Sequence, residues 1–403
     1  MFAPPVMQNR SNYLFLFLYL LFIIYGSLFP LAGWRTPEHG LLVVWQQALG
    51  QHLFRSDLLT NILVYCPLGF LLVPICSKRF GTFATIMASI TLGALLSFSM
   101  EYIQLFLPAR TSSAVDLLLN IVSTAIGAVA YRLLDRQADR GEWFGEWRHN
   151  HFDSGGGVDI GLAVIALWGT VQLAPFVPSL DFGTLKNGLK PLWQTVHDLS
   201  RFNWYRAGAY TLNIGALGAA LLLLIKQRKN APLWLCVYCG AVLLAKATIV
   251  GRQLSLEAMC GLVCGVMLTI GLRGLPRGGV AVAGFAAVAA AFTVEELRPD
   301  MTTVELHDFN WVPFSSQMMD NVSGMGGIIE GLWPFASLAF FAMTLSPDHL
   351  KRHPFVTGLL PISGVIALEY AQTGIAGRYP DITTIILAVI GWSIPLLLLR
   401  ENA

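Results

Sequence analysis

Long apolar runs alternate with short polar segments along the whole chain. A helix needs about 20 mostly apolar residues to cross the hydrocarbon core of a bilayer. By this measure we predict twelve transmembrane helices, near residues 13–31, 57–76, 82–107, 114–134, 158–178, 207–225, 231–250, 254–272, 279–296, 326–345, 355–375 and 382–399. An even number of spans places both termini on the same side of the membrane.

Basic residues indicate which side that is. Lys78 with Arg79, and Lys226 with Arg228 and Lys229, fall in loops that this count places on the side of the termini. Cytoplasmic loops carry an excess of Lys and Arg. We therefore predict that both termini are cytoplasmic.

The predicted loops on the opposite side repeat in a regular order. In each set of four spans a long loop joins the first two, and a tight turn joins the last two. These tight turns contain Ala109-Arg110, Gly251-Arg252 and Gly377-Arg378. Because self-similarity at a fixed spacing indicates internal repeats, we predict three four-helix units at residues 1–140, 141–275 and 276–403. The expected fold class is an all-α polytopic membrane protein, with a degenerate middle unit.

The composition agrees with a membrane protein. Of the 403 residues, 55% are hydrophobic and 12% are charged, against roughly 25% charged in an ordinary soluble domain. The net charge is +2 and the basic residues are dispersed, which gives no basic stripe for nucleic acid. We expect the lipid bilayer as a partner and no nucleic acid. The oligomeric state is not predicted.

Two similar polar motifs interrupt the apolar pattern. Glu101 with Gln104, and Glu369 with Gln372, stand three residues apart near the ends of two predicted spans, which places each pair on one helix face. A carboxylate inside a membrane is costly, at about 2.5 to 3.5 kcal/mol near the centre on insertion scales. We predict that an Arg nine residues after each Glu pairs with it, because guanidinium suits carboxylate.

Further polar residues extend this predicted site. The lettering D-L-L-x-N occurs twice, and Asp381 stands three residues after Arg378. The ligand-binding candidates are Glu101, Gln104, Arg110, Asp116, Glu369, Gln372, Arg378 and Asp381, with secondary candidates Arg55, Asp57, Asn61, Asn120 and Arg252. An alternative stays open for each Glu–Arg pair, which could fasten helices without meeting a ligand. Asn61 and Asn120 could likewise serve as hydrogen bonds between helices.

The middle unit keeps part of this pattern. Arg252 is retained, Lys246 takes the place of Gln104, and Leu243 takes the place of Glu101. Lys246 could join the site, or extend outward with its stem along the lipid. The sequence leaves both alternatives open.

These residues carry a resemblance to a known family. The run Arg55–Phe70, followed by Glu101-x-x-Gln104, Arg110, Asp116-x-x-x-Asn120 and Gly127, resembles the VanZ-like membrane proteins. The last third of the chain, with Trp311-x-Pro313-Phe314 and Glu369-x-x-Gln372, resembles the same domain more loosely. The resemblance implies a domain of four to five helices in a bacterial inner membrane, and we predict that this chain carries such domains in tandem, which departs from the single-domain form of the family. It also implies a link with cell-envelope or exopolysaccharide functions, the founding type being associated with low-level teicoplanin resistance.

Three functions remain open. The favoured one is a non-enzymatic envelope protein that binds an anionic or lipid-linked envelope component. The alternatives are an enzyme acting on polyprenyl phosphate or glycan, and a transporter with its site between repeats. The sequence has no G-x-x-x-x-G-K-[ST], G-x-S-x-G or H-E-x-x-H motif, so nucleotide, serine-hydrolase and zinc chemistry lack a motif. We expect no metal and no cofactor.

Overall fold

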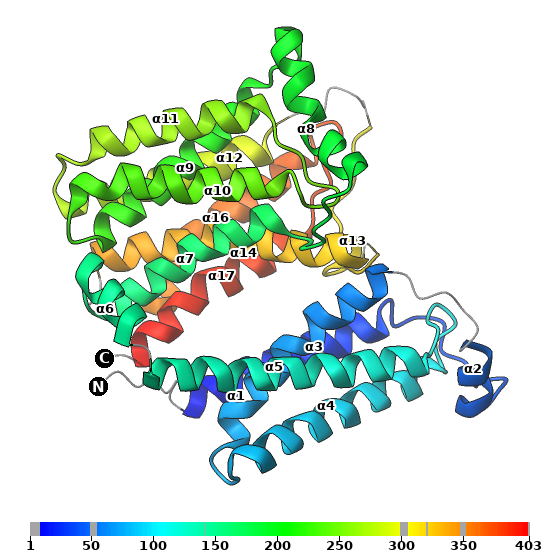
Figure 1. The fold of residues 1–403 in the computed structure, drawn as a ribbon. Coiled ribbons are helices and arrows are strands. Elements are labelled where there is room, and N and C mark those ends of the chain that lie inside the picture. Colours follow the sequence, from blue (N-terminus) through cyan, green and yellow to red (C-terminus); the bar gives the residue numbers. More distant parts are fainter. Residues whose placement is uncertain are drawn as a thin grey trace. The chain divides into compact units, whose positions relative to one another are not determined.

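A computed structural model describes residues 9–48, 55–140, 142–298, 305–319, 321–346 and 352–401. In these residues the chain forms sixteen α-helices, two short 3-10 helices and isolated β-bridges (Figure 1). The predicted all-α fold class is therefore confirmed.

Each of the twelve apolar runs coincides with a helix. Six helices are long and apolar enough to cross a membrane: Thr82–Gln104, Ala114–Asp135, Gly156–Leu173, Trp204–Leu224, Arg277–Glu296 and Gly326–Leu345. Four shorter apolar helices occupy Tyr13–Leu28, Thr60–Cys76, Leu256–Leu272 and Ile382–Leu398. The chain is thus an integral membrane protein, while the count of twelve spans and the cytoplasmic termini stay predictions.

The chain divides into two compact units. Unit 1 comprises Met1–Gly145 with Ser315–Met325, and unit 2 comprises Glu146–Phe314 with Gly326–Ala403. The finer division into repeats at 1–140, 141–275 and 276–403 stays a prediction.

Unit 1 is built around the contact between its second and fourth long helices. Its helices are α1 (Asn9–Leu28), α2 (Leu41–Ala48), α3 (Arg55–Cys76), α4 (Thr82–Gln104), α5 (Ala114–Arg140) and the short α13 (Ser315–Met319). Both α3 and α4 pack against α5 (Figure 1). A Cβ atom on Gly127 of α5 would overlap the carbonyl oxygen of Cys66, and one on Gly69 of α3 would overlap that of Thr124. Glycine at both positions is what lets the two backbones touch.

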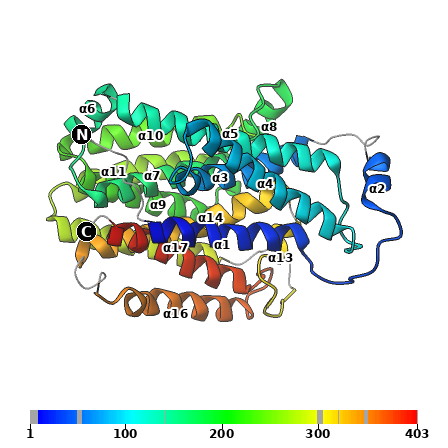
Figure 2. The same ribbon diagram turned by 90° about the horizontal axis from the view of Figure 1, so that it is seen from below.

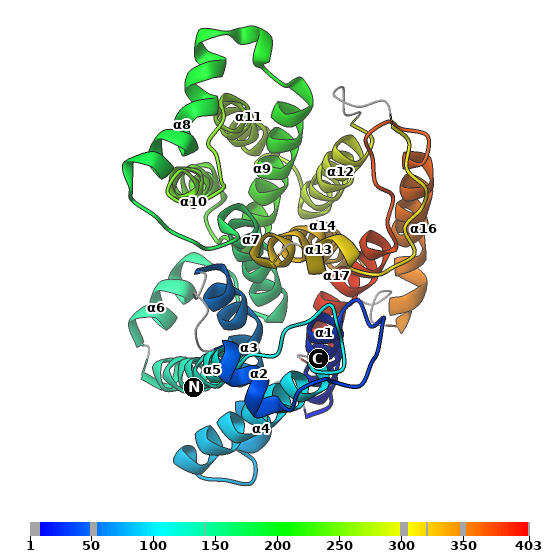
Figure 3. The ribbon, with the colours of Figure 1, turned by 90° about the vertical axis from the view of Figure 1, so that its right-hand side faces the viewer.

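Unit 2 is built around α9, in which every residue from Ile214 to Leu224 is buried. Helix α9 packs against α11 and α12, and these long helices run roughly along a common direction (Figures 1 and 2). Figure 3 shows α10 and α11 nearly end-on beside α9. The helices of this unit are α7 (Gly156–Leu173), α8 (Phe182–His197), α9 (Trp204–Leu224), α10 (Ala231–Lys246), α11 (Leu256–Leu272), α12 (Arg277–Glu296), α14 (Asn321–Leu345), α16 (Pro354–Gln372) and α17 (Ile382–Glu401).

Four short helices are additional to the predicted runs. They are α2, α8, α13 and α6 (Glu142–His151), which has 10 residues and leads into unit 2. Helix α8 lies at one end of the unit 2 helices rather than alongside them (Figure 1). These helices escape a search for apolar runs because they are short or carry polar residues on one face.

Candidate functional site

Glu101 lies at the C-terminal end of α4 with only 4% of its surface exposed. Its Oε2 atom accepts a hydrogen bond from the backbone N–H of Ser113 at 2.7 Å, and its carboxylate also interacts with the Ser112 side chain. Ser113 directly precedes α5, and its hydroxyl accepts from the N–H groups of Val115 and Asp116. The first N–H groups of a helix lack intrahelical partners, and negative charge is favourable there. Glu101 therefore fixes the start of α5 to the end of α4.

Ser112 links Glu101 to the short helix α2. The indole Nε1 of Trp45 donates to Ser112 Oγ at 2.9 Å. The Trp45 ring also packs edge-on against Phe98, with 6.3 Å between ring centroids. Ser112 and Trp45 are not among the predicted site residues, because contacts between a loop and a distant helix leave no spacing signal in the sequence.

The predicted amides connect helices in the same part of unit 1. Asn61 Nδ2 on α3 donates to Asp116 Oδ1 on α5 at 3.0 Å. Asn120 Nδ2 on α5 donates to Ser97 Oγ on α4 at 2.9 Å. In the described residues the Oδ1 atom of Asn120 is buried without a hydrogen-bond partner. These contacts have the form expected of hydrogen bonds between membrane helices.

Tyr65 belongs to this group although the sequence prediction omits it. It is 3% exposed, interacts through its hydroxyl with Ser97, and is coupled electrostatically to Glu101 and Asp116. Tyr65 stands four residues after Asn61 on α3, which places both on one helix face. The four-residue spacing from Asn61 is the sequence signal that could have identified Tyr65. We call the set Asn61, Tyr65, Ser97, Glu101, Ser112, Ser113, Asp116 and Asn120 the α4–α5 cluster.

Arg110 contacts the end of α1 instead of Glu101. Its Nη2 atom donates to the backbone carbonyl of Gly26, and Gln104 Nε2 donates to the neighbouring carbonyl of Ser27 at 2.9 Å. Among the described residues, no ion pair joins Arg110 to Glu101. The predicted pairing is therefore wrong, and the physical reason is that the last carbonyls of a helix lack intrahelical partners and favour a cation.

Arg110 keeps one donor without a partner. Its Nε atom is buried, and no hydrogen-bond acceptor meets it within the described part of the chain. Burial lowers the pKa of the Arg110 guanidinium below its ordinary value, yet an arginine remains charged at neutral pH. A half-buried guanidinium with a buried, unused donor is costly unless an anion or a polar group compensates it.

The second predicted motif shows related contacts in unit 2. Glu369 Oε2 accepts from the backbone N–H of Asp381 at 2.8 Å, and its carboxylate interacts with Thr384. Asp381 directly precedes α17 and accepts from the N–H of Thr383. Gln372 Nε2 donates to Glu296 Oε2 at 2.6 Å. Glu369 thus fixes the start of α17, as Glu101 does for α5.

Arg378 contacts the end of α12 rather than Glu369. Its Nη2 donates to the carbonyl of Glu295, and its Nε donates to the carbonyl of Arg298 at 2.8 Å. No ion pair joins it to Glu369 in the residues that the structure describes. The second predicted Glu–Arg pairing is therefore also wrong, for the same physical reason.

Arg252 and Lys246 occupy comparable places in the middle of the chain. Arg252 donates through Nε to the carbonyl of Ala174 and through Nη2 to that of Val171 at 3.3 Å, both at the end of α7. Lys246 is 7% exposed and donates to Gln172 at 2.9 Å and to the Tyr210 hydroxyl at 2.8 Å. Lys246 therefore points into the bundle and does not extend along the lipid.

The residues directly before α5, α11 and α17 correspond in position. Ser113, Ser255 and Asp381 each stand three residues after an Arg and directly precede a helix. Ser255 Oγ accepts from the N–H of Ala258, as a helix N-cap does. Asp381 is thus comparable with Ser113, and Thr384, which interacts with Glu369, is comparable with Asp116.

Two secondary candidates, Arg55 and Asp57, stay predictions. The side chains of Arg55 and Asp57, in the first turn of α3, lie outside the described residues. No group of three or more His, Cys, Asp and Glu that could hold a metal ion occurs among the described residues.

Comparison with known proteins identifies one part of the chain. The VanZ/LLP1 family model matches residues 13–135, which include α1 from Tyr13 onward, α2, α3, α4 and most of α5. No curated protein and no solved structure matches the chain. The chain is an integral membrane protein that carries one VanZ/LLP1 domain at residues 13–135.

Proposed function

We propose that the VanZ/LLP1 domain binds the anionic group of a lipid-linked cell-envelope component through Arg110. The observation that carries this proposal is the buried Nε atom of Arg110, which lacks a partner among the described residues. A guanidinium binds phosphate and carboxylate through charge-assisted hydrogen bonds. An anion at Nε would accept the hydrogen bond from this donor and would also neutralise the charge of the half-buried guanidinium.

The comparable arginines support assigning this role to Arg110. Arg252 and Arg378 each use both Nε and Nη2 on helix carbonyls, and Arg378 also attracts Glu296 electrostatically. Both therefore have the contacts of a helix cap, whereas Arg110 makes one such contact among the residues that the structure describes. We propose a structural role for Arg252 and Arg378, together with Glu369, Gln372 and Asp381 around the latter.

The carboxylates of the α4–α5 cluster have a different proposed role. Glu101 and Asp116 accept hydrogen bonds from Ser113 and Asn61, so these contacts hold the α4–α5 turn that contains Arg110. We propose that Glu101, Asp116 and Gln104 position Arg110 rather than contact an anion. Two carboxylates beside an anionic ligand would repel it.

We also propose that the three units at 1–140, 141–275 and 276–403 are internal repeats, and that the last is a second VanZ-like domain. The arginines support this, since Arg110, Arg252 and Arg378 contact carbonyls 84, 78 and 83 residues earlier in the chain. Gln104, Lys246 and Gln372 contact residues 77, 74 and 76 positions earlier. Similar contacts at similar separations are expected of one supersecondary unit that occurs three times.

The binding proposal is tested with a polyprenyl phosphate as the probe. Purified protein is reconstituted in vesicles that contain the probe, and bound probe is measured after detergent extraction. Arg110→Gln should retain at least about tenfold less probe, since hydrogen bonds to charged groups contribute roughly 1.5 to 3 kcal/mol. Arg110→Lys keeps the charge and should retain an intermediate amount.

Arg252→Gln is the matched control, because it removes a guanidinium whose Nε and Nη2 both bond to carbonyls. It should destabilise the protein without changing probe retention. Equal losses of probe in Arg110→Gln and Arg252→Gln would reject the proposed site. Chemical turnover of the probe by the wild-type protein would support the alternative of an enzyme.

A further inference from the structure

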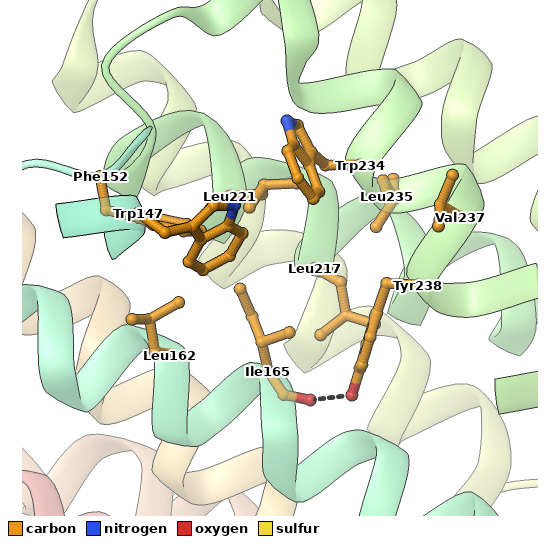
Figure 4. Close-up of a pocket in the computed structure, with 10 residues that line it drawn as sticks. All are labelled: Trp147, Phe152, Leu162, Ile165, Leu217, Leu221, Trp234, Leu235, Val237 and Tyr238. Carbon is orange, nitrogen blue, oxygen red and sulfur yellow. Dashed lines mark hydrogen bonds between the residues drawn. The ribbon is translucent and has the colours of Figure 1, made fainter. Parts of the chain in front are cut away.

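Unit 2 contains an apolar cavity of about 330 Å³ between α6, α7, α9 and α10, a volume typical of small-molecule sites. Figure 4 shows Trp147 and Trp234 on one side of the cavity and Leu162, Ile165 and Tyr238 on the other. All of the lining residues belong to unit 2.

The Tyr238 hydroxyl in the lining is already engaged. Tyr238 donates its hydroxyl hydrogen to the carbonyl of Ile165 at 2.6 Å (Figure 4). The same hydroxyl accepts from the N–H of Gly169 at 3.1 Å. A polar ligand would therefore find apolar surface and no free hydrogen-bonding group on this side chain. The cavity suits a hydrocarbon.

The cavity lies near the ends of helices that can cross a membrane. Leu162 and Ile165 stand six and nine residues after the start of α7, which is about 9 and 14 Å along the helix axis. The rings of Trp147 and Trp234 lie 5.7 Å apart above them. Tryptophan is enriched at the membrane interface, where one end of its ring is apolar and the other wet. Lipid chains occupy the depth just below that level.

Positive charge lies beside the two tryptophans. Lys226 and Lys229 are exposed, and neither forms an ion pair in the described residues. Lys226 donates to the carbonyl of His149, and its own N–H bonds to His151, whose ring lies 5.7 Å from Trp234.

The nearby acids do not neutralise these lysines. Asp153 pairs with Arg277 at 3.1 Å, and Asp159 pairs with Arg148. Neither lysine is thus paired with a carboxylate in the described residues, and Lys226 lies beside the aromatic rings at the cavity. This is the charge pattern that an anionic lipid would complement.

We propose that this cavity holds the hydrocarbon chain of an anionic membrane lipid, with the lipid headgroup beside Lys226 and Lys229. The chain would fill the space between Trp147 and Ile165, and the lysines would select a negative headgroup. This site uses residues of unit 2 alone, so it does not depend on the role proposed for Arg110.

The test uses vesicles with equal amounts of phosphatidylglycerol and phosphatidylcholine. Protein extracted from them is analysed by native mass spectrometry for retained lipid. Wild-type protein should retain one phosphatidylglycerol. Ile165→Trp, which fills the cavity, should lose it, whereas Leu244→Trp on the exposed face of α10 should retain it. Equal phosphatidylglycerol retention by these two variants would overturn the proposal.

A second pair of substitutions tests the headgroup and does not disturb the apolar lining. Lys226→Gln with Lys229→Gln should lower the ratio of phosphatidylglycerol to phosphatidylcholine by about fivefold per lysine. Protein that retains detergent only, or both lipids equally before any substitution, would contradict the proposed anionic lipid. Loss of this lipid with unchanged binding at Arg110 would separate the two sites.

Discussion

The guanidinium of Arg110 donates to the backbone carbonyl of Gly26, 84 residues earlier in the chain. This contact places a cation at the end of α1, where unpaired carbonyl groups favour positive charge. At the start of α5, unpaired N–H groups favour negative charge, and there Glu101 accepts a hydrogen bond from the N–H of Ser113. Arg110 and Glu101 therefore bind the ends of two different helices rather than each other.

The first prediction concerns Glu101. Glu101→Gln keeps an acceptor for the Ser113 N–H, whereas Glu101→Leu leaves that group without one. The Leu variant should lose about 1 to 3 kcal/mol of unfolding free energy, and the Gln variant should lose less. Denaturant unfolding in detergent measures the difference. A Leu variant at least as stable as the Gln variant would refute the helix-start role.

The second prediction concerns the contact between α3 and α5. Gly127→Ala adds a Cβ that overlaps the Cys66 carbonyl, so the helices must separate, at a cost of roughly 1 to 3 kcal/mol. Gly240 of α10 is the matched control, since no atom lies within 4 Å of its added Cβ. Gly240→Ala should stabilise the protein by about 0.5 to 1 kcal/mol. Thermal unfolding should show a lower melting temperature for Gly127→Ala and a higher one for Gly240→Ala than for the wild type.

The third prediction concerns pH and α8. Hydrogen bonds from the Ser179 hydroxyl, and from the hydroxyl and N–H of Thr184, lower the pKa of Asp181 to about 2. A carboxyl with a depressed pKa stabilises the fold above its unfolded pKa of about 3.9. That stabilisation is lost as pH falls toward 2. The protection of the amides in the first turn of α8 against hydrogen exchange, relative to their intrinsic rates, should therefore fall below about pH 4.

Asp181→Asn supplies the control for this titration. The amide still accepts from the N–H of Thr184 but does not titrate, so its exchange rate in the first turn of α8 should lack the acid transition. An identical transition in Asp181→Asn and in the wild type would assign the effect to another group.

The fourth prediction concerns membrane topology. If the three turns that contain Arg110, Arg252 and Arg378 lie on one non-cytoplasmic side, single cysteines there should react alike. In a cysteine-free background, Ala109→Cys, Gln253→Cys and Tyr379→Cys should react with an impermeant maleimide from outside intact cells, and Lys229→Cys should react only after lysis. Reaction of the first three from different sides would disprove the three-repeat topology.

The apolar pattern predicted where the long helices lie, because each of the twelve runs coincides with a helix. It did not predict α2, which brings Trp45 to Ser112, since eight residues are too few to register as a span. The motif around Glu101 and Arg110 led to the VanZ resemblance, and a VanZ/LLP1 domain at residues 13–135 confirms it. The tandem arrangement of such domains stays a proposal.

The contacts of the charged residues were harder to predict. Nearness in sequence favoured Glu101 as the partner of Arg110, but Gly26 is the partner in the fold. Every residue has a backbone carbonyl, so the amino-acid sequence does not indicate which carbonyl will accept a hydrogen bond from Arg110. Tyr65 could have been found by its spacing from Asn61, whereas Ser112 could not, because its role depends on two residues from other helices.

A lipid-resolved density map of the purified wild-type protein with bound polyprenyl phosphate tests the role of Arg110 most directly. We predict a phosphate oxygen within about 3 Å of Arg110 Nε, and no such density in Arg110→Gln. A map in which a carboxylate of the protein fills that position, or in which the phosphate lies elsewhere, would contradict the proposed binding site.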